Sequence, residues 1–298
     1  MKVLVTGARG LIGSALVPTL AAEGHEVVRV TRSEPRGPAE VRWDPMAGAM
    51  DRAALDGVDA VVHLAGESVA GRWTDGKKRR IRDSRVLGTR LLAQAAAGRE
   101  RGPRAMVCAS AIGYYGDRGE ERLTEASPPG EGFIVEVVRD WEQAADPARA
   151  AGIRVAHLRF GIVQSPRGGA LRAQLPLFRL GLGGPVGSGR QYLSWVAIDD
   201  VVRAIEHALR DDRLSGPANV TAPEPVTNAA YASALGRVLR RPAVLPAPTP
   251  AVRLVLGEFA GELLSSRRVL PERLLETGFE FRHPDLEAAL RHVLGRPA

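Results

Sequence analysis

Cysteine and long apolar runs are both scarce in this chain of 298 residues. The single cysteine, Cys108, lies in the apolar run AMVCAS, which excludes an intramolecular disulfide and a thiolate metal cluster. No apolar run approaches the roughly 18 residues that a membrane span requires. The N-terminus, MKVLVTGARG, resembles a strand and not a signal peptide. We therefore expect a soluble, cytoplasmic protein that has no membrane partner.

Lysine is almost absent, although the chain is basic, with a formal net charge of +7. The lysines are Lys2, Lys77 and Lys78, and the many arginines are spread along the chain among acidic residues. A dispersed charge of this kind does not predict a nucleic-acid partner, and the one basic block, 77–80, fits the solvated start of a helix. The six histidines have no metal-ligand spacing and no carboxylate cluster beside them, so we expect no metal.

Apolar strands alternate with longer helical stretches in the first half of the chain. Strands are predicted at 2–6, 26–31, 58–64, 105–110 and 153–160, and helices at 11–23, 74–97 and 132–151. Strands joined by crossover helices form right-handed βαβ units. The sequence therefore predicts an α/β protein with a Rossmann-type, doubly wound parallel sheet.

The second half is looser and rich in glycine and proline from about residue 166. We expect a Rossmann domain over 1–165 and a smaller, mostly helical C-terminal substrate lobe over 166–298. A helix at 199–210 and a strand near 218–221 are expected to return to the first domain.

A glycine loop gives the most specific signal. In TGARGLIG, Gly7 permits a tight turn, Gly10 admits a pyrophosphate close to the backbone, and Gly13 allows close helix packing. Because the loop follows a strand and opens a helix, Leu11 and Ile12 would offer N–H groups to an anion. This placement predicts a dinucleotide site.

The end of the second predicted strand bears on which dinucleotide is bound. An NAD site usually has an acidic residue there, whereas a 2′-phosphate favours arginine. Here Arg32 and Ser33 stand at the tip, and Arg9 lies in the glycine loop, so NADP is favoured over NAD. Two alternatives stay open: the arginines are solvated surface residues, or nearby Glu34 holds an NAD ribose. On the adenosine side, close backbone approach is expected from Leu64, Ala65 and Gly66.

Several motifs resemble the extended and atypical branch of the short-chain dehydrogenase/reductase superfamily, in particular the NAD-dependent epimerase/dehydratase-like proteins often described as nucleoside-diphosphate-sugar epimerases. The C-terminal run resembles a DUF1731-type segment. The matching motifs are TGARGLIG (6–13), VVHLAGE (61–67), SAIGYYGD (110–117), LRFGIV (158–163), SWVAIDDVVRAI (194–205) and GELLSSRRVLPERLLETGFEF (261–281). The resemblance implies a nucleotide-binding fold whose C-terminal lobe closes over a small-molecule substrate.

The chain departs from this superfamily where the chemistry would be. The family's proton relay is a Tyr-x-x-x-Lys pair, yet no lysine stands four residues after any of the four tyrosines. The segment expected to carry the pair, 133–137, is apolar at both positions. The family's Ser/Thr position falls on Ala111, with Ser110 one residue earlier. Either other residues replace the relay, or the protein binds NADP without catalysing the family's reaction.

Four residues are candidates for a rebuilt site. Ser110 could hold a substrate oxygen or bond its own loop, and Tyr114 or Tyr115 could donate a proton or form a wall of the pocket. Glu67, which follows the predicted strand at 58–64, could act as a base or cap a loop. Lys77 is expected on a surface helix start.

The resulting hypothesis is an NADP-binding, epimerase-like oxidoreductase that transfers hydride to or from a sugar-like or other small polar substrate. The alternative is a non-catalytic NADP-binding sensor or regulatory protein. An apolar stripe with helical spacing belongs to the core or to a homodimer interface: Val252, Leu256, Phe259 and Leu263.

Overall fold

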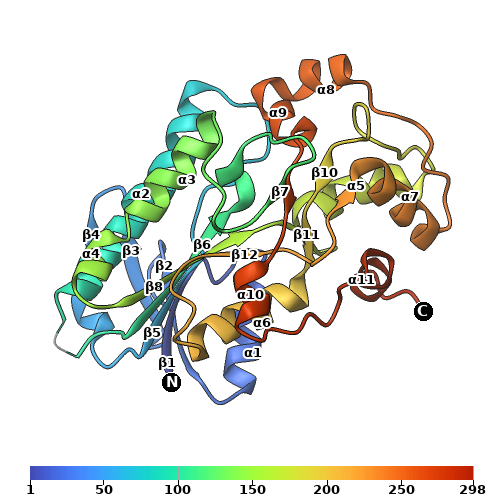
Figure 1. Ribbon diagram of the computed structural model, residues 1–298. Coiled ribbons are helices and arrows are strands. Elements are labelled where there is room, and N and C mark those ends of the chain that lie inside the picture. Colours follow the sequence, from blue (N-terminus) through green and yellow to red (C-terminus); the bar gives the residue numbers. More distant parts are fainter. Residues whose placement is uncertain (100, 298) are drawn as a thin grey trace.

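An eight-stranded sheet forms the centre of the computed structural model, which describes residues 1–99 and 101–297 (Figure 1). The strands lie in the order β12-β8-β6-β5-β1-β2-β3-β4, and all neighbours are parallel except β3 and β4. Their bounds are β1 Lys2–Thr6, β2 Glu26–Thr31, β3 Glu40–Asp44, β4 Ala49–Met50, β5 Ala60–His63, β6 Ala105–Ala111, β8 Arg154–Phe160 and β12 Gly216–Val220. The predicted doubly wound α/β fold is confirmed.

Both faces of the sheet are buried, as the apolar strands require. Along β1, Val3 and Val5 pack on one side with α1 (Gly13–Ala22) and α6 (Ile198–Arg210). Leu4 points to the other side, where α2 (Asp75–Ala97) and α4 (Asp146–Ala150) cover the sheet, and α3 (Phe133–Gln143) lies beside α2. The alternation follows from the two-residue period of a strand.

The chain leaves the central sheet after β8 and returns to it. β9 (Ile162–Gln164) pairs with β11 (Trp195–Ala197), with α5 (Gly169–Arg179) and β10 (Tyr192–Leu193) between them. α6 then packs on the sheet, and β12 pairs with β8 along its whole length. Both α6 and β12 thus pack with the strands of the N-terminal part.

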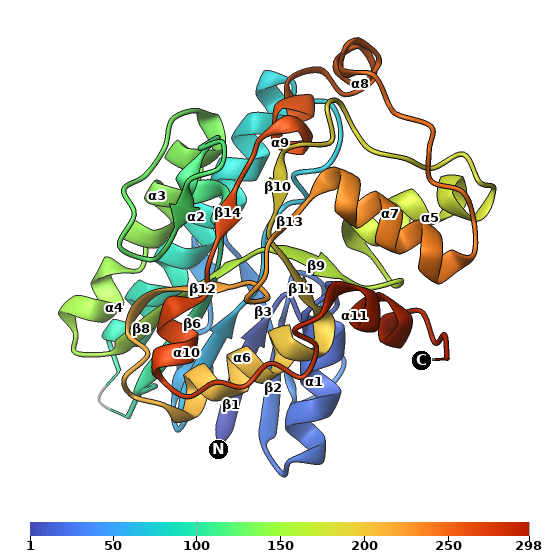
Figure 2. The ribbon, with the colours of Figure 1, turned by 45° about the vertical axis from the view of Figure 1, so that its right-hand side comes forward.

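Most of the remaining C-terminal segments form a second layer above the sheet edge, whereas α10 (Glu272–Glu276) packs on β12 beside α6 (Figure 2). α5, α7 (Asn228–Leu239) and α11 (Leu286–Val293) share one apolar core with Trp195. Among the short elements, β13 (Val226–Thr227) pairs with β10, and β14 (Arg268–Val269) pairs with β7 (Arg122–Leu123). The others are the helices α8 (Thr249–Leu256), α9 (Ala260–Leu264) and α10. No helix among the described residues is both long and apolar enough to span a membrane.

One sequence prediction of secondary structure was wrong, and one strand that matters for the site was not predicted. The helix expected over 132–151 is divided into α3 and α4, because Pro147 lacks the N–H that a continuous helix would need at that position. The strand β3 was not predicted, since only Val41 and Trp43 in it are apolar and it lies between glycine- and proline-rich turns. β3 matters for the site because it brings Glu40 under the glycine loop.

Candidate functional site

The glycine loop crosses the carboxyl end of β5 at a distance that only glycine permits. Gly7 has a φ of +68°, and a Cβ there would lie 2.7 Å from the carbonyl carbon of Leu64. A Cβ on Gly13 would lie 2.3 Å from the oxygen of Gly7, while Gly10 N–H donates to that same oxygen at 2.9 Å. These contacts fix the turn that delivers the chain into α1.

Thr6 and His63 hold this loop from below. Thr6 Oγ1 accepts the backbone N–H groups of Leu64 (3.1 Å) and Ala65 (3.2 Å) and donates its own proton to His63 Nδ1 at 2.7 Å. Burial lowers the pKa of His63 to about 4, so its ring is neutral and able to accept.

A cavity of about 260 Å³ opens beside the loop, at the carboxyl ends of β1, β2 and β5. Among the residues predicted to bind a cofactor, those that line it are Gly7, Arg9, Arg32, Ser33, Ala65 and Gly66. Leu11 lines a neighbouring cavity instead. Gly10, Ile12, Gly13 and Leu64 contribute to the loop and to its packing. An elongated ligand can therefore follow the loop from the β2 tip toward Gly66.

Three arginines and one buried acid set the charge at the β2 end of the cavity. Glu40 lies 3.6 Å from Arg9 and 3.4 Å from Arg29, and Arg32 lines the same wall. The backbone N–H of Arg36 holds the pKa of Glu40 below its usual range, with the charges of Arg29 and Arg9 adding to the effect. Arg9 and Arg29 thus face the Glu40 carboxylate, and with Arg32 they leave an excess of positive charge in this cavity, an arrangement suited to an additional anion.

Glu34 turns away from this cavity. Its carboxylate is bonded to Arg42 on β3 and is largely exposed, and Glu34 is not part of the cavity wall. Glu34, the acidic residue that left NAD open as the cofactor in the sequence, is therefore paired with Arg42 instead.

Glu67 also lines the cavity and is ion-paired. Lys77 Nζ donates to Glu67 Oε1 at 2.7 Å, and this bond lowers the pKa of Glu67. The backbone of Glu67 is also held, since its N–H donates to Ser84 Oγ (3.0 Å) and its carbonyl accepts from Arg85 (2.9 Å). The structure thus brings together Glu67 and Lys77, a pair that the sequence treated separately.

Ser110 lies in a buried polar network on the other half of the sheet. Its hydroxyl donates to Glu142 Oε1 at 2.6 Å, and Arg159 binds both oxygens of Glu142 at 2.8 Å. Burial by itself would raise the pKa of Glu142, but its bonds to Arg159 outweigh burial, so the pKa is lowered. Glu142 was missed in the sequence because nothing local distinguishes it from a surface residue of α3.

The two adjacent tyrosines extend this network. Tyr115 is fully buried, donates to Asn219 Oδ1 at 2.8 Å and accepts from Arg159 at 3.0 Å. Burial raises the pKa of Tyr115 to about 12, which opposes deprotonation. Tyr114 is partly exposed and packs its ring against the Arg159 guanidinium, 3.5 Å from the ring centroid. Catalytic roles for Ser110, Tyr114 and Tyr115 stay predictions, and burial disfavours Ser110 and Tyr115.

The position of the family's proton relay is occupied by an apolar cluster. Phe133 packs against Trp73 with ring centroids 5.2 Å apart, and Phe259 from the C-terminal layer lies 5.7 Å from Trp73. Val137 is buried in the same cluster, and Lys78 lies over the Phe133 ring. Among the described residues of this cluster there is no phenol, and the Lys78 ammonium is partly exposed.

The glycine loop, the cavity at the carboxyl edge and the strand order together define a Rossmann-type dinucleotide-binding protein. The family model of the NAD dependent epimerase/dehydratase family matches residues 3–221, and a domain of unknown function, DUF1731, matches 247–293. The chain therefore belongs to the NAD dependent epimerase/dehydratase family, as its motifs predicted.

Similar proteins cover the whole chain. Epimerase family protein Mb2239 of Mycobacterium bovis is 44% identical over 99% of this chain and 98% of its own. The crystal structure of human epimerase family protein SDR39U1 with NADPH has a TM-score of 0.91 at 38% identity, covering 99% of both chains. MoeE5 in complex with UDP-glucuronic acid and NAD has a TM-score of 0.78 at 25% identity, covering 97% of this chain and 96% of its own.

Proposed function

We propose that this protein binds NADP(H) in the cavity beside the glycine loop. The observation that carries the proposal is the group of Arg9, Arg29 and Arg32 at the end of β2, where an NAD site would have a ribose-binding acid. A 2′-phosphate supplies the anion that these guanidinium groups favour. The human relative crystallised with NADPH supports the same choice.

The residues of this chain have distinct roles in that complex. Arg32 and Arg9 would bind the 2′-phosphate, with Ser33 beside them, while Gly66 and Ala65 admit the adenosine side by close backbone approach. Gly10, Leu11 and Ile12 would present the start of α1 to the pyrophosphate, because a helix N-terminus favours an anion.

We further propose that the protein is an oxidoreductase acting on a small polar or sugar-like substrate. The bound nicotinamide would supply the hydride chemistry. Glu67 lines the cavity and is ion-paired with Lys77, so Lys77 would hold Glu67 anionic and ready to orient a substrate hydroxyl. Tyr114 would act as a wall or proton donor, and Ser110 and Tyr115 would position Arg159 and Glu142.

A second function is favoured by a separate observation. Phe133 and Val137 occupy the position of the family's proton relay with apolar side chains. Phe259 from the C-terminal layer packs against Trp73 in the same cluster. A protein that binds NADP(H) and signals its level without turnover needs no proton relay. The non-catalytic alternative therefore stands beside the enzyme.

Titration with NADPH and NADH, followed by nicotinamide fluorescence, tests the cofactor. We expect NADPH to bind at least about tenfold more tightly, because bonds to charged groups contribute roughly 1.5–3 kcal/mol. Arg32→Ala should abolish the preference, whereas Arg90→Ala, on the exposed face of α2, should keep it. Equal affinities in the wild type, or a preference for NADH, would contradict the assignment.

Turnover distinguishes the enzyme from the sensor. NADPH oxidation and NADP+ reduction would be followed with small carbonyl compounds and with UDP-glucuronic acid, the sugar nucleotide bound by MoeE5. The enzyme proposal expects turnover that falls in Glu67→Gln and Tyr114→Phe while NADPH affinity is kept. Tight NADPH binding without turnover of any of these substrates would favour the non-catalytic alternative.

A further inference from the structure

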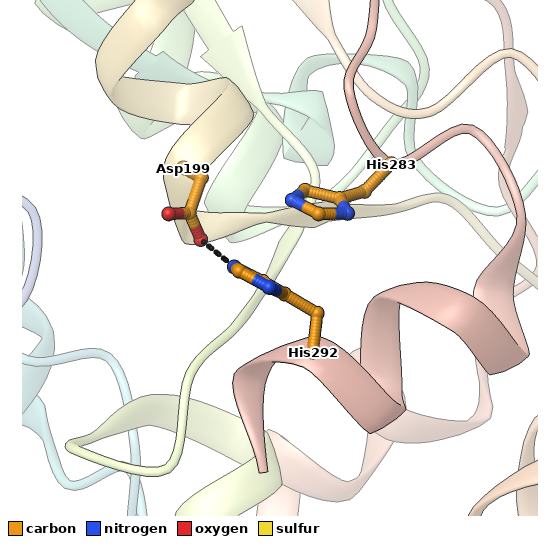
Figure 3. A group of neighbouring side chains, drawn as sticks. All are labelled: Asp199, His283 and His292. Carbon is orange, nitrogen blue, oxygen red and sulfur yellow. Dashed lines mark ion pairs between the residues drawn. The ribbon is translucent and has the colours of Figure 1, made fainter. Parts of the chain in front are cut away.

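A group of metal-ligand side chains lies away from the nucleotide cavity, where α6 meets the C-terminal segment. Asp199, His283 and His292 each offer one ligand atom, and these atoms all lie within 4.8 Å of one another (Figure 3). His292 Nε2 is 3.3 Å from Asp199 Oδ2, and the two imidazole rings stack with centroids 4.2 Å apart. The sequence predicted no metal because these residues are distant in the chain and show no ligand spacing.

The backbone around these side chains is held firmly. Asp200, which is fully buried, accepts the N–H groups of Arg282 (2.8 Å) and His283 (2.9 Å). The carboxylate next to Asp199 therefore fixes the loop that carries His283 against the first turn of α6. His292 is carried by α11, whose Leu286 and Leu290 are buried in the C-terminal core.

Two of the three side chains line a large cavity that is open to solvent. Asp199 and His292 line a space of about 680 Å³ together with Leu11, Ser14 and Pro18 at the start of α1. His292 is half exposed and Asp199 is 42% exposed, so both side chains can move by small rotations. Such rotations would bring the donors to the separation of about 3.3 Å that tetrahedral bonds of 2.0–2.1 Å require.

We infer that Asp199, His283 and His292 form a binding site for a divalent transition metal, for which Zn²⁺ is the best fit. Two imidazoles and one carboxylate are the donor set of three-ligand zinc sites, in which water or another ligand takes the fourth position. The open side of the cavity provides room for that fourth ligand. Because the ligands come from α6 and from the segment 283–292, a bound ion would tie the C-terminal helix to the central sheet.

Neighbouring arginines lower the expected affinity for a cation, but the carboxylates that pair with them are not the proposed metal ligands. Arg203 and Arg210 line the same cavity and are paired with Asp200 and Glu23, respectively. Arg167 and Arg282 also line it, and their charge opposes a cation. We therefore expect binding that is specific in stoichiometry and geometry but weaker than in a site without basic neighbours.

Metal titration of the untagged full-length chain tests this inference. Zn²⁺ would be titrated calorimetrically, and Co²⁺ would be followed by its visible ligand-field absorption, which reports tetrahedral coordination. We expect one ion per chain, a tetrahedral Co²⁺ spectrum that Zn²⁺ abolishes, and a Zn²⁺-dependent rise in Tm.

Substitutions at the three ligands decide whether this site is responsible. Removing one ligand in His292→Gln, His283→Gln or Asp199→Asn should weaken Zn²⁺ binding roughly tenfold or more and remove the Co²⁺ spectrum. Asp212→Asn, at an almost fully exposed carboxylate, is the matched control and should bind like the wild type. His292→Gln and Asp199→Asn change partly exposed side chains, so the fold should persist, as circular dichroism would verify.

Two outcomes would overturn the inference. One is the absence of saturable binding at one ion per chain. The other is a wild-type Zn²⁺ affinity and Co²⁺ spectrum in both His292→Gln and Asp199→Asn. Neither outcome bears on the nucleotide proposal, because the metal ligands do not line the nucleotide cavity.

Discussion

The two halves of the sheet edge differ in whether their charged side chains face a cavity or are buried. On the β1–β2 side, Arg9 and Arg32 line an open cavity with Glu40 as the nearby counter-ion. On the β6–β8–β12 side, Arg159 is buried, binds Glu142 through two bonds and contacts Tyr115. Basic groups that face a cavity are available to a ligand, whereas a satisfied buried network holds the fold. The comparison indicates that the charged groups offered to a ligand lie in the cavity on the β1–β2 side and not in the buried network.

The largest effect is expected from breaking the buried network. Arg159→Ala leaves the Glu142 carboxylate buried without its partner, so the free energy of unfolding should fall by about 3–5 kcal/mol. Arg82→Ala on α2 removes an exposed arginine that pairs with Asp140 on α3, and the free energy of unfolding should fall by less than about 1 kcal/mol. Chemical denaturation measures both. Equal losses in the two variants would remove the contrast between buried and open charge.

Acid should destabilise the protein through its buried histidines. Burial lowers the pKa values of His63 and His157 to about 4, whereas both would titrate near 6.5 in the unfolded chain. Between pH 6.5 and 4 the unfolded chain therefore binds more protons, and the free energy of unfolding falls as pH falls. The slope approaches about 1.4 kcal/mol per pH unit for each histidine.

Denaturation at several pH values measures this slope. His157→Gln should reduce the slope by the contribution of one proton, leaving that of His63. A stability profile that is flat between pH 6.5 and 4.5 would show that neither histidine is neutral by burial.

At the glycine loop we expect a smaller loss of stability and a complete loss of NADPH binding. In Gly13→Ala the new methyl group meets the Gly7 carbonyl oxygen, which should cost about 1–3 kcal/mol and displace the loop, so that NADPH binding is lost. Gly261→Ala in α9 is the matched control, because a Cβ there meets nothing within 4 Å. NADPH titration of both variants provides the measurement, and undiminished binding in Gly13→Ala would contradict the role of the loop.

The smallest effect is expected from Glu34→Gln. The Glu34–Arg42 pair is exposed, so stability should change by less than about 1 kcal/mol. The ratio of NADPH to NADH affinity should stay the same, since Glu34 does not line the cavity. A large drop in NADH affinity would instead identify Glu34 as a ribose ligand and reopen NAD as the cofactor.

Local patterns were sufficient to predict the parts of the site that one loop or one strand end supplies. The glycine loop, Arg32 and Glu67 lie next to recognisable strands, so their position at the sheet edge could be predicted. Glu40 could not be predicted, because its strand β3 has only two apolar residues and the segments on either side form turns. The bond from Ser110 to Glu142 and the group of Asp199, His283 and His292 depend on tertiary packing. Only the relative placement of separate elements brings such residues together.

The return of the chain to the central sheet determines how the molecule can be divided. β12 pairs with β8 and α6 covers the sheet, although both follow residue 165 in the sequence. A fragment cut at residue 165 would leave β8 as an uncovered edge with unpaired N–H and C=O groups, a known template for aggregation. Deletion experiments on the C-terminal layer should therefore keep the chain through Val220, so that loss of solubility is not mistaken for loss of function.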